Sequence, residues 1–395
     1  MRIIKGPYLQ RPETDAVTVM WQTDEEAVGQ LRVYPAEVPQ VPAMQWRKYG
    51  WSIQGEPMVF TGEKTRIHKI RATGLLPGQP YYYEVQAKTE DAIAQSDRYT
   101  FSTAPEKTDA FSFVAAAEFG TCWQPNNPAA EPMLELIRRE HPDFLLSVGD
   151  LVHEDGRDDS EWGEYLFGPF GELLRTTPIY PCVGNHEVGF TAAGLPEEAY
   201  RYENFKKYFD LPPYYAFDYG CAHFCVLDCP SMIASVTRTD DDGYVTHLIP
   251  DFMECDQIRF LKEDLARTKA KWKFVAFHFP PYTSAWFTVR DLQLLAPIFE
   301  AYGVDIVFNS HAVIYERTHP IRNGAVAPEG VRYVVVGGFG AFEKWIRDKT
   351  TRFSAKVSAR PSYVRVSVTP WRMELQAIDC EGKLFDTLTI DKPES

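Results

Sequence analysis

Apolar side chains recur at every second position in several segments of the first hundred residues, which is the pattern of strands with one buried face. Val17, Val19 and Trp21 follow this spacing, and residues 31–34 and 68–70 indicate further strands. Later in the chain the pattern changes to short, continuous apolar runs that alternate with helix-like segments. Such runs are typical of strands buried on both faces. The sequence therefore predicts an all-β region followed by an α/β region.

The predicted boundaries of the two regions are residues 1–105 and 110–395, with a linker at 102–107. Within the first region, residues 74–85 contain two leucines, a Pro-Gly turn and a run of tyrosines, which resembles a corner of a fibronectin type III-like sandwich. The second region has predicted helices at 131–140, 257–269 and 291–302. Its predicted strands are 111–114, 144–148, 274–277 and 306–308, with 333–336, 363–368 and 373–378 completing a second sheet.

The composition is that of an ordinary folded protein of about two domains. Of the 395 residues, 45% are hydrophobic and 24% are charged. The net charge of −14 disfavours a nucleic-acid backbone as partner, because no basic stripe offsets it. The chain has no apolar run of about 18 residues, so we expect no membrane span. Seven scattered cysteines and the lack of a signal-peptide pattern favour a cytoplasmic protein. The sequence does not indicate the oligomeric state.

Metal-binding side chains follow five of the segments in this second region. Because catalytic groups in such sheets gather at the carboxyl ends of the strands, we expect these side chains to lie close together. Carboxylate, amide and imidazole donors of this kind suit metal ions. The five segments are AEFG at 117–120, GDLVH at 149–153, GNHE at 184–187, FH at 277–278 and SHAVIYER at 310–317.

This set of motifs resembles the calcineurin-like metallophosphoesterase superfamily, and within it the purple acid phosphatases, which also carry an N-terminal sandwich. The resemblance implies a four-layer αββα fold for the second region and a site for two metal ions bridged by one carboxylate. It assigns the bridge to Asp150 and the other ligands of the second metal to Asn185, His278 and His311. It makes His186 the catalytic histidine, which donates a hydrogen bond or proton near the leaving oxygen.

Three positions of the first metal site depart from the purple acid phosphatase pattern. Glu118 stands where that family has Asp, His153 where it has Tyr, and Val313 where it has His. Without the tyrosine phenolate, a purple iron centre is not expected, and Val313 offers no ligand. Three interpretations remain open. Glu118, Asp150 and His153 hold a divalent metal with water, or only one metal binds, or the site is vestigial and the chain is a binding protein.

The function that the resemblance implies is metal-dependent hydrolysis of small phosphomonoesters or phosphodiesters, by a metal-activated hydroxide with His186 assisting. The expected cofactors are one or two ions per chain of iron, zinc or manganese. A mononuclear or non-phosphatase metalloenzyme and a catalytically impaired phosphoesterase-fold binding protein are the alternatives. The sequence does not identify the substrate.

Several neighbouring residues have expected roles around this centre. Glu187 is expected to support its loop by hydrogen bonds. Tyr315 is a candidate for lining the cleft, and Arg317 is expected to be structural. Cys122 is either a helper of the metal site or a buried thiol, and three aromatic residues either stack on a leaving group or pack at the rim: Trp123, Tyr282 and Trp286.

Overall fold

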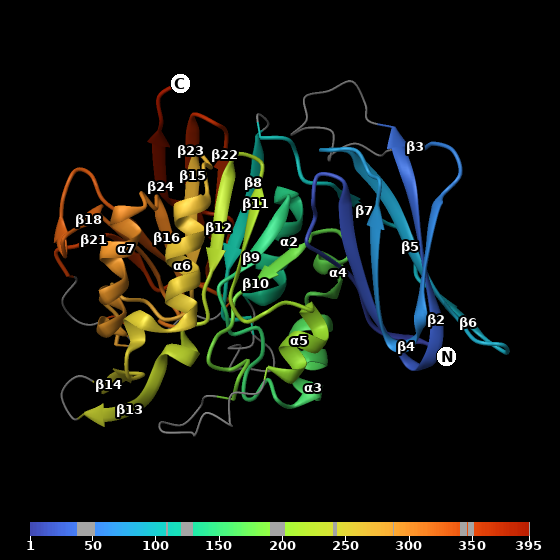
Figure 1. Ribbon diagram of the computed structural model, residues 1–395, viewed down its shortest axis with the longest axis horizontal. Coiled ribbons are helices and arrows are strands. Elements are labelled where there is room, and N and C mark those ends of the chain that lie inside the picture. The colour runs from blue at the N-terminus through green and yellow to red at the C-terminus, as the bar shows by residue number, and fades with distance from the viewer. Residues whose placement is uncertain are drawn as a thin grey trace.

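The computed structural model has an all-β N-terminal part and an α/β part that contains two packed sheets (Figure 1). This is the fold class that the sequence predicts. Over the described ranges, no helix is long and apolar enough to cross a membrane. The structure describes residues 1–37, 52–107, 110–119, 129–189, 202–239, 243–286, 288–339, 346 and 351–394.

The N-terminal part is organised around one long strand, β2 (Ala16–Glu37). The sequence predicts two strands here, at 17–22 and 31–34, but register shifts between Gln22 and Ala27 and between Val28 and Gln30 let a single strand bend and continue. β2 pairs with β1 on one part of its length and with β5 on another, and with β4 along most of it. The other strands are β1 (Ile3–Gln10), β3 (Ser52–Ile53), β4 (Met58–Thr73), β5 (Pro80–Lys88), β6 (Ile93–Gln95) and β7 (Tyr99–Ser102).

The predicted tyrosine-rich corner forms at the start of β5. The backbone N–H of Leu76 donates a hydrogen bond of 2.9 Å to the hydroxyl of Tyr81. This bond ties the Pro-Gly turn to the strand that follows it, as the corner of a fibronectin-like sandwich requires. The rings of Tyr81 and Phe101 stack beneath it, with their centroids 5.4 Å apart.

The first sheet of the α/β part joins three parallel strands to three antiparallel ones. Residues 363–368 and 373–378 lie in this sheet, because β22 pairs with β8 at its edge, so their predicted place in the second sheet is wrong. The parallel strands are β8 (Phe111–Ala116), β9 (Phe144–Ser147) and β10 (Ile179–Pro181), and the others are β22 (Ser362–Val368), β23 (Arg372–Asp379) and β24 (Leu384–Asp391).

The second sheet has a parallel centre that contains the predicted strand at residues 333–336. Its strands, in spatial order, are β11 (Tyr215–Tyr219), β12 (Ala222–Val226), β15 (Trp272–Ala276), β16 (Ile306–Asn309), β20 (Arg332–Val336), β17 (Tyr315–Thr318) and β21 (Ser354–Ser358). Among the described residues, two short strand pairs lie outside these sheets: β13 (Ile233–Thr239) with β14 (Gly243–Leu248), and β18 (Ile321–Arg322) with β19 (Ala325–Val326).

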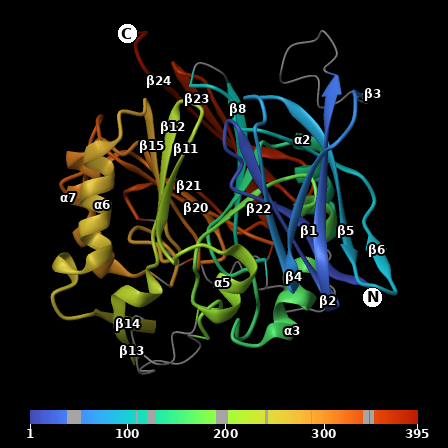
Figure 2. The same ribbon diagram turned by 45° about the vertical axis from the view of Figure 1, so that its right-hand side comes forward.

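The two sheets pack face to face through aromatic side chains. Phe113 of β8 meets Phe224 of β12 edge to face at 5.3 Å, and Phe274 of β15 at 5.8 Å. Helices α6 (Asp256–Arg267) and α7 (Ala296–Ala301) cover the outer side of the second sheet (Figure 1, Figure 2). Helix α2 (Ala130–Glu140) packs on the first sheet. The layers therefore follow the predicted αββα order.

The predicted helix at 291–302 is divided into a 3₁₀ turn at Arg290–Leu295 and the α-helix α7. Pro297 lies in the first turn of α7, where its missing N–H is tolerated but cannot continue a helix from the preceding residues. The remaining helical segments are α3 (Asp159–Glu161), a π-helix at Trp162–Phe167, α4 (Gly171–Leu174), α5 (Glu203–Phe209), and 3₁₀ turns at Pro230–Met232 and Phe252–Glu254.

The N-terminal part is joined to the α/β part by backbone pairing. β1 runs parallel to β10 at Gln10 and Ile179, so the first sheet continues into the N-terminal strands. The amide of Gln10 and the hydroxyl of Tyr8 each donate a 2.7 Å hydrogen bond to the carbonyl of Tyr208. The division at residues 105 to 110 stays a prediction.

Candidate metal centre

The candidate site lies where strands of both sheets end. Glu118 follows β8, Asp150 follows β9 and Asn185 follows β10, all in the first sheet. His278 follows β15 and His311 follows β16, in the second sheet. Since these strands run parallel within each sheet, their carboxyl ends meet at one edge, as the motif order predicts.

Four of the predicted ligands converge on one point. Nε2 of His278 lies 3.0 Å from Oδ2 of Asp150 and 3.1 Å from Oδ1 of Asn185. Ligand atoms of Asp150, His278 and His311 all lie within 4.8 Å of one another. A cation between them would therefore meet one carboxylate, one amide oxygen and two imidazoles.

The orientation of His278 is fixed from behind. Its Nδ1 lies 2.8 Å from the carbonyl of Val148, which can only accept, so Nδ1 carries the proton and Nε2 faces the other ligands. Gly149, with φ of +98°, makes this approach possible, because a Cβ there would lie 2.6 Å from Nδ1 of His278. The loop after β9 thus has a glycine where the histidine ring must come close.

Backbone strain is concentrated at this edge. Glu118, Asp150, His311 and Val313 have φ values of +58°, +56°, +63° and +49°, in the left-handed region that non-glycine residues seldom adopt. Such conformations persist where surrounding structure holds them, and they cluster at functional sites. The β-branched side chain of Val313 makes that position the most strained of the four.

The protonation states of the converging residues are set by burial and by their mutual charges. Burial alone would lower the pKa of His278, but the charge and hydrogen bond of Asp150 raise it to about 9. Burial would raise the pKa of Asp150, yet the charges of His278 and His186 hold it well below its usual range. Burial and the charge of His278 lower the pKa of His311 to about 3. Asp150 is therefore ionised and His311 neutral, the forms that bind metal ions, whereas the protonated His278 must release its Nε2 proton when it binds one.

Glu187 holds two of the ligand loops together. Its carboxylate accepts hydrogen bonds from the backbone N–H groups of Gly184 at 2.6 Å, Asp150 at 2.8 Å and Leu151 at 2.6 Å. These bonds tie the loop after β9 to the loop after β10. The expected supporting role of Glu187 is confirmed.

Glu118 is engaged with the His311 loop. Its Oε1 accepts hydrogen bonds of 2.6 Å from the hydroxyl of Ser310 and from the backbone N–H of His311. Burial, followed by the charge of Asp150, raises the pKa of Glu118 to about 8, although the positive charge of His278 and these hydrogen bonds oppose the shift. Oε1 of Glu118 thus holds the loop that carries His311, a predicted metal ligand. Sequence reasoning missed Ser310, because only the fold brings it next to a residue 192 positions earlier.

The other two altered positions differ in character. Val313 is buried, with 2% of its surface exposed, and presents only methyl groups. His153 is half-buried, and its ring lies nearly parallel to that of His186, with centroids 6.1 Å apart. Its backbone N–H donates to Glu161 at 3.1 Å. His153 is therefore beside the centre, whereas Val313 adds no donor to it.

His186 lies at the open side of the centre, with 16% of its side chain exposed. Its backbone N–H donates to Oδ1 of Asp150 at 3.2 Å, and its Nε2 lies 3.8 Å from Oδ2 of the same residue. Its Nδ1 lies 3.4 Å from the carbonyl of Glu154. Since a carbonyl only accepts, this contact favours the proton on Nδ1 and leaves Nε2 toward the site.

Several predicted neighbours have other roles. Tyr315 does not line a cleft, because it is fully buried and its hydroxyl donates to Asp386 at 2.6 Å. Arg317 is structural as expected, since its guanidinium forms two bonds to the same carboxylate. Tyr282 is buried against Tyr333, whereas Trp286 is exposed. Cys122 and Trp123 lie outside the described residues.

The converging residues fit a metal ion. Two imidazole nitrogens, a carboxylate and an amide oxygen form a mixed donor set that suits zinc, iron or manganese. The hydrogen bonds behind His278 and around Asp150 orient these donors inward, as the outer contacts of metal sites do. The fit rests on the half of the centre where Asp150, Asn185, His278 and His311 converge. The other half has fewer free donors, because Val313 offers none and one oxygen of Glu118 is hydrogen-bonded.

Comparisons with known proteins agree with this geometry. Residues 121–315 match the calcineurin-like phosphoesterase family, and residues 6–103 match the N-terminal domain of purple acid phosphatases. The chain is 26% identical over 315 residues to purple acid phosphatase 15 of Arabidopsis thaliana. The matched region covers 70% of this chain but only 54% of that protein. It is 25% identical to acid phosphatase type 7 of Mus musculus, covering 98% of this chain and 90% of that one.

The fold also matches a solved structure. A purple acid phosphatase isolated from yellow lupin seeds superposes with a TM-score of 0.74, over 98% of this chain and 74% of the lupin chain. At 19% identity this likeness concerns the fold. It covers both the N-terminal strands and the two-sheet part that carries the site.

Proposed function

Because the chain belongs to the calcineurin-like phosphoesterases, with a purple acid phosphatase N-terminal domain before the phosphoesterase domain, we propose that it is a metal-dependent hydrolase of small phosphoesters. The observation that carries this proposal is the convergence of Asp150, His278 and His311 within 4.8 Å, with His186 beside them. The acid phosphatases among its relatives support the reaction class. Phosphomonoesters and phosphodiesters are both candidate substrates.

The metal ligands in this proposal are Asp150, Asn185, His278 and His311. When bound, a metal ion supplies Lewis-acid polarisation of a phosphoryl oxygen and makes a water molecule a stronger nucleophile. The chain contributes fixed donors: Val148 orients His278, and Glu187 holds the backbone on both sides of Asp150. Preorganised donors of this kind need little rearrangement when a substrate arrives.

His186 is the proposed proton carrier. Its contact with the Glu154 carbonyl directs Nε2 to the site, and its exposed face can reach a substrate oxygen. In this position Nε2 can hold a proton near the leaving oxygen and release it as the ester bond breaks.

The metal content in this proposal is one tightly held ion per chain. The support is the contrast in donors, since four side chains converge on one half whereas Val313 removes one donor from the other. Glu118 and His153 are candidate ligands for a second ion, held more weakly because Oε1 of Glu118 is already hydrogen-bonded twice. Zinc, iron and manganese are the candidate ions.

The test is the turnover of a phosphomonoester and a phosphodiester substrate by the wild type and by His186→Ala, each with its metal content measured. We expect His186→Ala to lower kcat by about 100-fold or more, as for the loss of a general acid, with the metal content unchanged. His319→Ala, at an exposed histidine outside the site, is the matched control and should keep full turnover.

Two results would overturn the proposal. The first is turnover that is equal in His186→Ala and the wild type, because the proton carrier would then be elsewhere or the activity would belong to a contaminant. The second is the lack of any turnover by metal-loaded wild type on both substrates. That second result would favour a binding protein with a phosphoesterase fold.

A further inference from the structure

A second cavity of about 670 Å³ lies at the opposite end of the second sheet from the metal centre. It opens where β12 and β15 begin, between the end of helix α6 and the turn that joins β22 to β23. Lys271 precedes β15 and His278 follows it, so at about 3.3 Å per residue the two ends are roughly 20 Å apart. A ligand in this cavity would not touch the proposed metal ligands. The volume is within the range of small-molecule sites.

The lining is basic, although the whole chain is acidic. Four cationic side chains line the cavity, against two carboxylates, whereas the net charge of the chain is −14. The local potential is therefore reversed, which favours an anionic ligand. Arg267 is paired with Glu263 at 2.8 Å, whereas Lys269 takes part in none of the ion pairs among the described residues, so its ammonium group can meet such a ligand. The four cations are those of Lys107, Arg267, Lys269 and Lys271.

The two carboxylates of the lining are already engaged by a histidine. His223 donates from Nδ1 to Asp218 at 2.8 Å and from Nε2 to Asp264 at 2.7 Å. Both ring nitrogens face carboxylates, which only accept when ionised, so the geometry is that of a protonated imidazole. The charge of His223 compensates part of the negative charge of Asp218 and Asp264. These carboxylates therefore repel an anion less than two free ones would.

An aromatic ring is placed beside the cations. Trp371 lies in the turn between β22 and β23 and is 42% exposed, which is unusual for so large an apolar side chain. Nζ of Lys271 lies 4.8 Å from the centroid of its ring. A flat ring next to an ammonium group suits a ligand whose aromatic part stacks on the ring and whose anionic part pairs with the cation.

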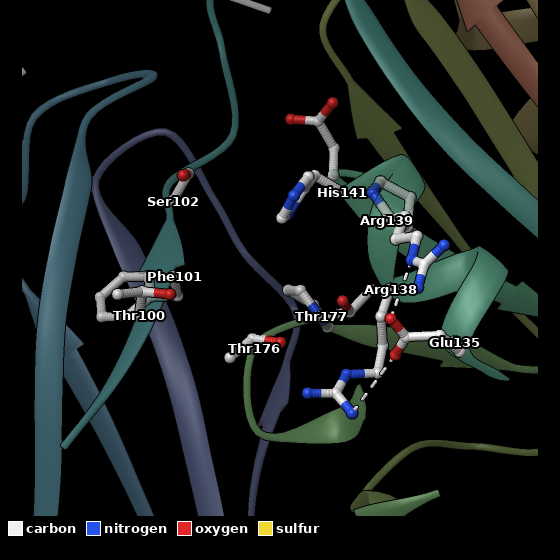
Figure 3. A pocket seen from close by; sticks show the side chains of 12 residues that line it. Thr100, Phe101, Ser102, Glu135, Arg138, Arg139, His141, Thr176 and Thr177 are labelled. Carbon is white, nitrogen blue, oxygen red and sulfur yellow. Dashed lines mark hydrogen bonds and ion pairs between the residues drawn. The ribbon is translucent and has the colours of Figure 1, made fainter. Parts of the chain in front are cut away.

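A smaller cavity elsewhere in the molecule offers a contrast. It measures about 360 Å³ and lies beside β7, next to the end of helix α2 (Figure 3). Its arginines are paired within the protein, since Arg139 contacts Glu135 at 2.8 Å and Arg138 contacts Glu172 at 2.8 Å. The cations of this smaller cavity are thus neutralised locally, and it provides a control.

From these observations we propose that the larger cavity binds a small aromatic phosphate, such as a nucleoside phosphate. The base would stack on Trp371, and the phosphates would meet the ammonium groups of Lys269 and of Lys271, whose Nζ also donates to the carbonyl of Pro393 at 2.8 Å. We expect this ligand to be bound and not hydrolysed there, because both ring nitrogens of His223, the histidine of the lining, are already engaged by Asp218 and Asp264. The proposal concerns a site separate from the proposed phosphoesterase centre.

The test is isothermal titration of the full-length protein with a non-hydrolysable imido analogue of ATP, in a buffer of stated salt concentration. The variants are Trp371→Ala, Trp371→Phe and Lys269→Glu, with Arg139→Glu at the smaller cavity as the matched control. We expect Trp371→Ala to weaken binding by about 10-fold, as for the loss of one base-stacking partner, and Trp371→Phe to restore most of it. Lys269→Glu should weaken binding and make it less dependent on salt. Arg139→Glu should bind like the wild type.

A second set of measurements distinguishes binding in the cavity from binding at the proposed metal centre, and the contribution of the base from that of the phosphates. Asp150→Asn, which alters the proposed metal centre, should bind the analogue as the wild type does. Tripolyphosphate should bind more weakly than the analogue, because it has no ring. The proposal is overturned if the wild type does not bind, if Trp371→Ala and Lys269→Glu leave the Kd unchanged, if tripolyphosphate binds equally well, or if Asp150→Asn alone abolishes binding. Thermal unfolding of each variant shows whether it is folded.

Discussion

The two halves of the proposed metal centre differ in how many donors they present. In one half, Asp150, Asn185, His278 and His311 approach a common point from four loops. In the other half, the positions that the purple acid phosphatase pattern gives to Asp, Tyr and His hold Glu118, His153 and Val313. Glu118 directs one oxygen to Ser310 and to the backbone of His311.

This difference shows that residues of the altered half can support the intact half. By accepting the N–H of His311, Glu118 stabilises the loop that presents a ligand to the other half. A longer carboxylate in the altered half is thus compatible with an ordered site for one ion. Both halves keep left-handed backbone conformations, at Asp150 and His311 as well as at Glu118 and Val313, so the loop geometry is retained where the donors are not.

The largest effect is expected from Asp150→Asn. This change removes the carboxylate that touches Nε2 of His278 and accepts the N–H of His186. Because changes to groups that merely support ligands already cost about 10–100-fold in metal affinity, losing this ligand should cost more than about 100-fold. Competition with a chelator measures the affinity. An unchanged affinity would show that the intact half is not the metal site.

Glu118→Gln is the matched variant on the other half. The amide oxygen can still accept from Ser310 and His311, so the loop should remain in place. We expect the tightly held ion to be retained with an affinity within about 10-fold of the wild type, the lower limit for a supporting group. If instead it lowers metal affinity as much as Asp150→Asn does, the two halves are not distinct and Glu118 is a main ligand.

A smaller effect, in the opposite direction, is expected from Val313→His. Histidine tolerates a φ near +49° better than a β-branched residue, and it returns an imidazole donor to the altered half. We expect binding of a second ion to strengthen by about 10-fold. Val313→Ala relieves the same strain without adding a donor and should not strengthen it. Equal second-ion binding in these two variants would contradict the proposed deficit of donors.

The smallest effect on the metal centre is expected from His223→Asn, at the far end of the second sheet. Burial lowers the pKa of His223, but Asp218 and Asp264 outweigh burial and raise it to about 9. The folded-state pKa lies above the unfolded value of about 6.5, so the stabilisation is complete below pH 6.5 and is lost as pH rises through about 9. It amounts to an order of 1–3 kcal/mol.

Urea unfolding of the wild type between about pH 6 and pH 10 measures this loss. In His223→Asn the decline across that window should be flatter, while the metal content stays as in the wild type. Identical declines in the two proteins would show that His223 does not carry the stabilisation.

Much of the fold could be predicted from local patterns. Apolar runs gave the positions of β8, β9, β15 and β16 because buried parallel strands are continuously hydrophobic. The sheet assignment of β22 and β23 could not be predicted, since it depends on pairing between Val366 and Phe113, which are far apart in the sequence. The bend of β2 could not be predicted for a similar reason, because register shifts depend on the partner strands.

At the site, the residue types were predictable and the contacts were not. The motifs placed Asp150, Asn185 and His278 after strands, and the fold then brings these together. Glu118 accepts a hydrogen bond from Ser310 only because the two sheets pack against each other, and no local sequence pattern encodes this packing. The burial of Tyr315 against Asp386 likewise depends on the last strand of the chain.

The central claim is that one half of the centre holds an ion tightly and the other does not. The most direct test is the number of metal ions per chain in freshly purified protein after extensive gel filtration, measured by inductively coupled plasma mass spectrometry. The account predicts about one ion per chain, retained by Glu118→Gln and lost from Asp150→Asn. Two ions per chain that survive the same treatment would contradict it, because Glu118 and His153 would then form a complete second site despite Val313.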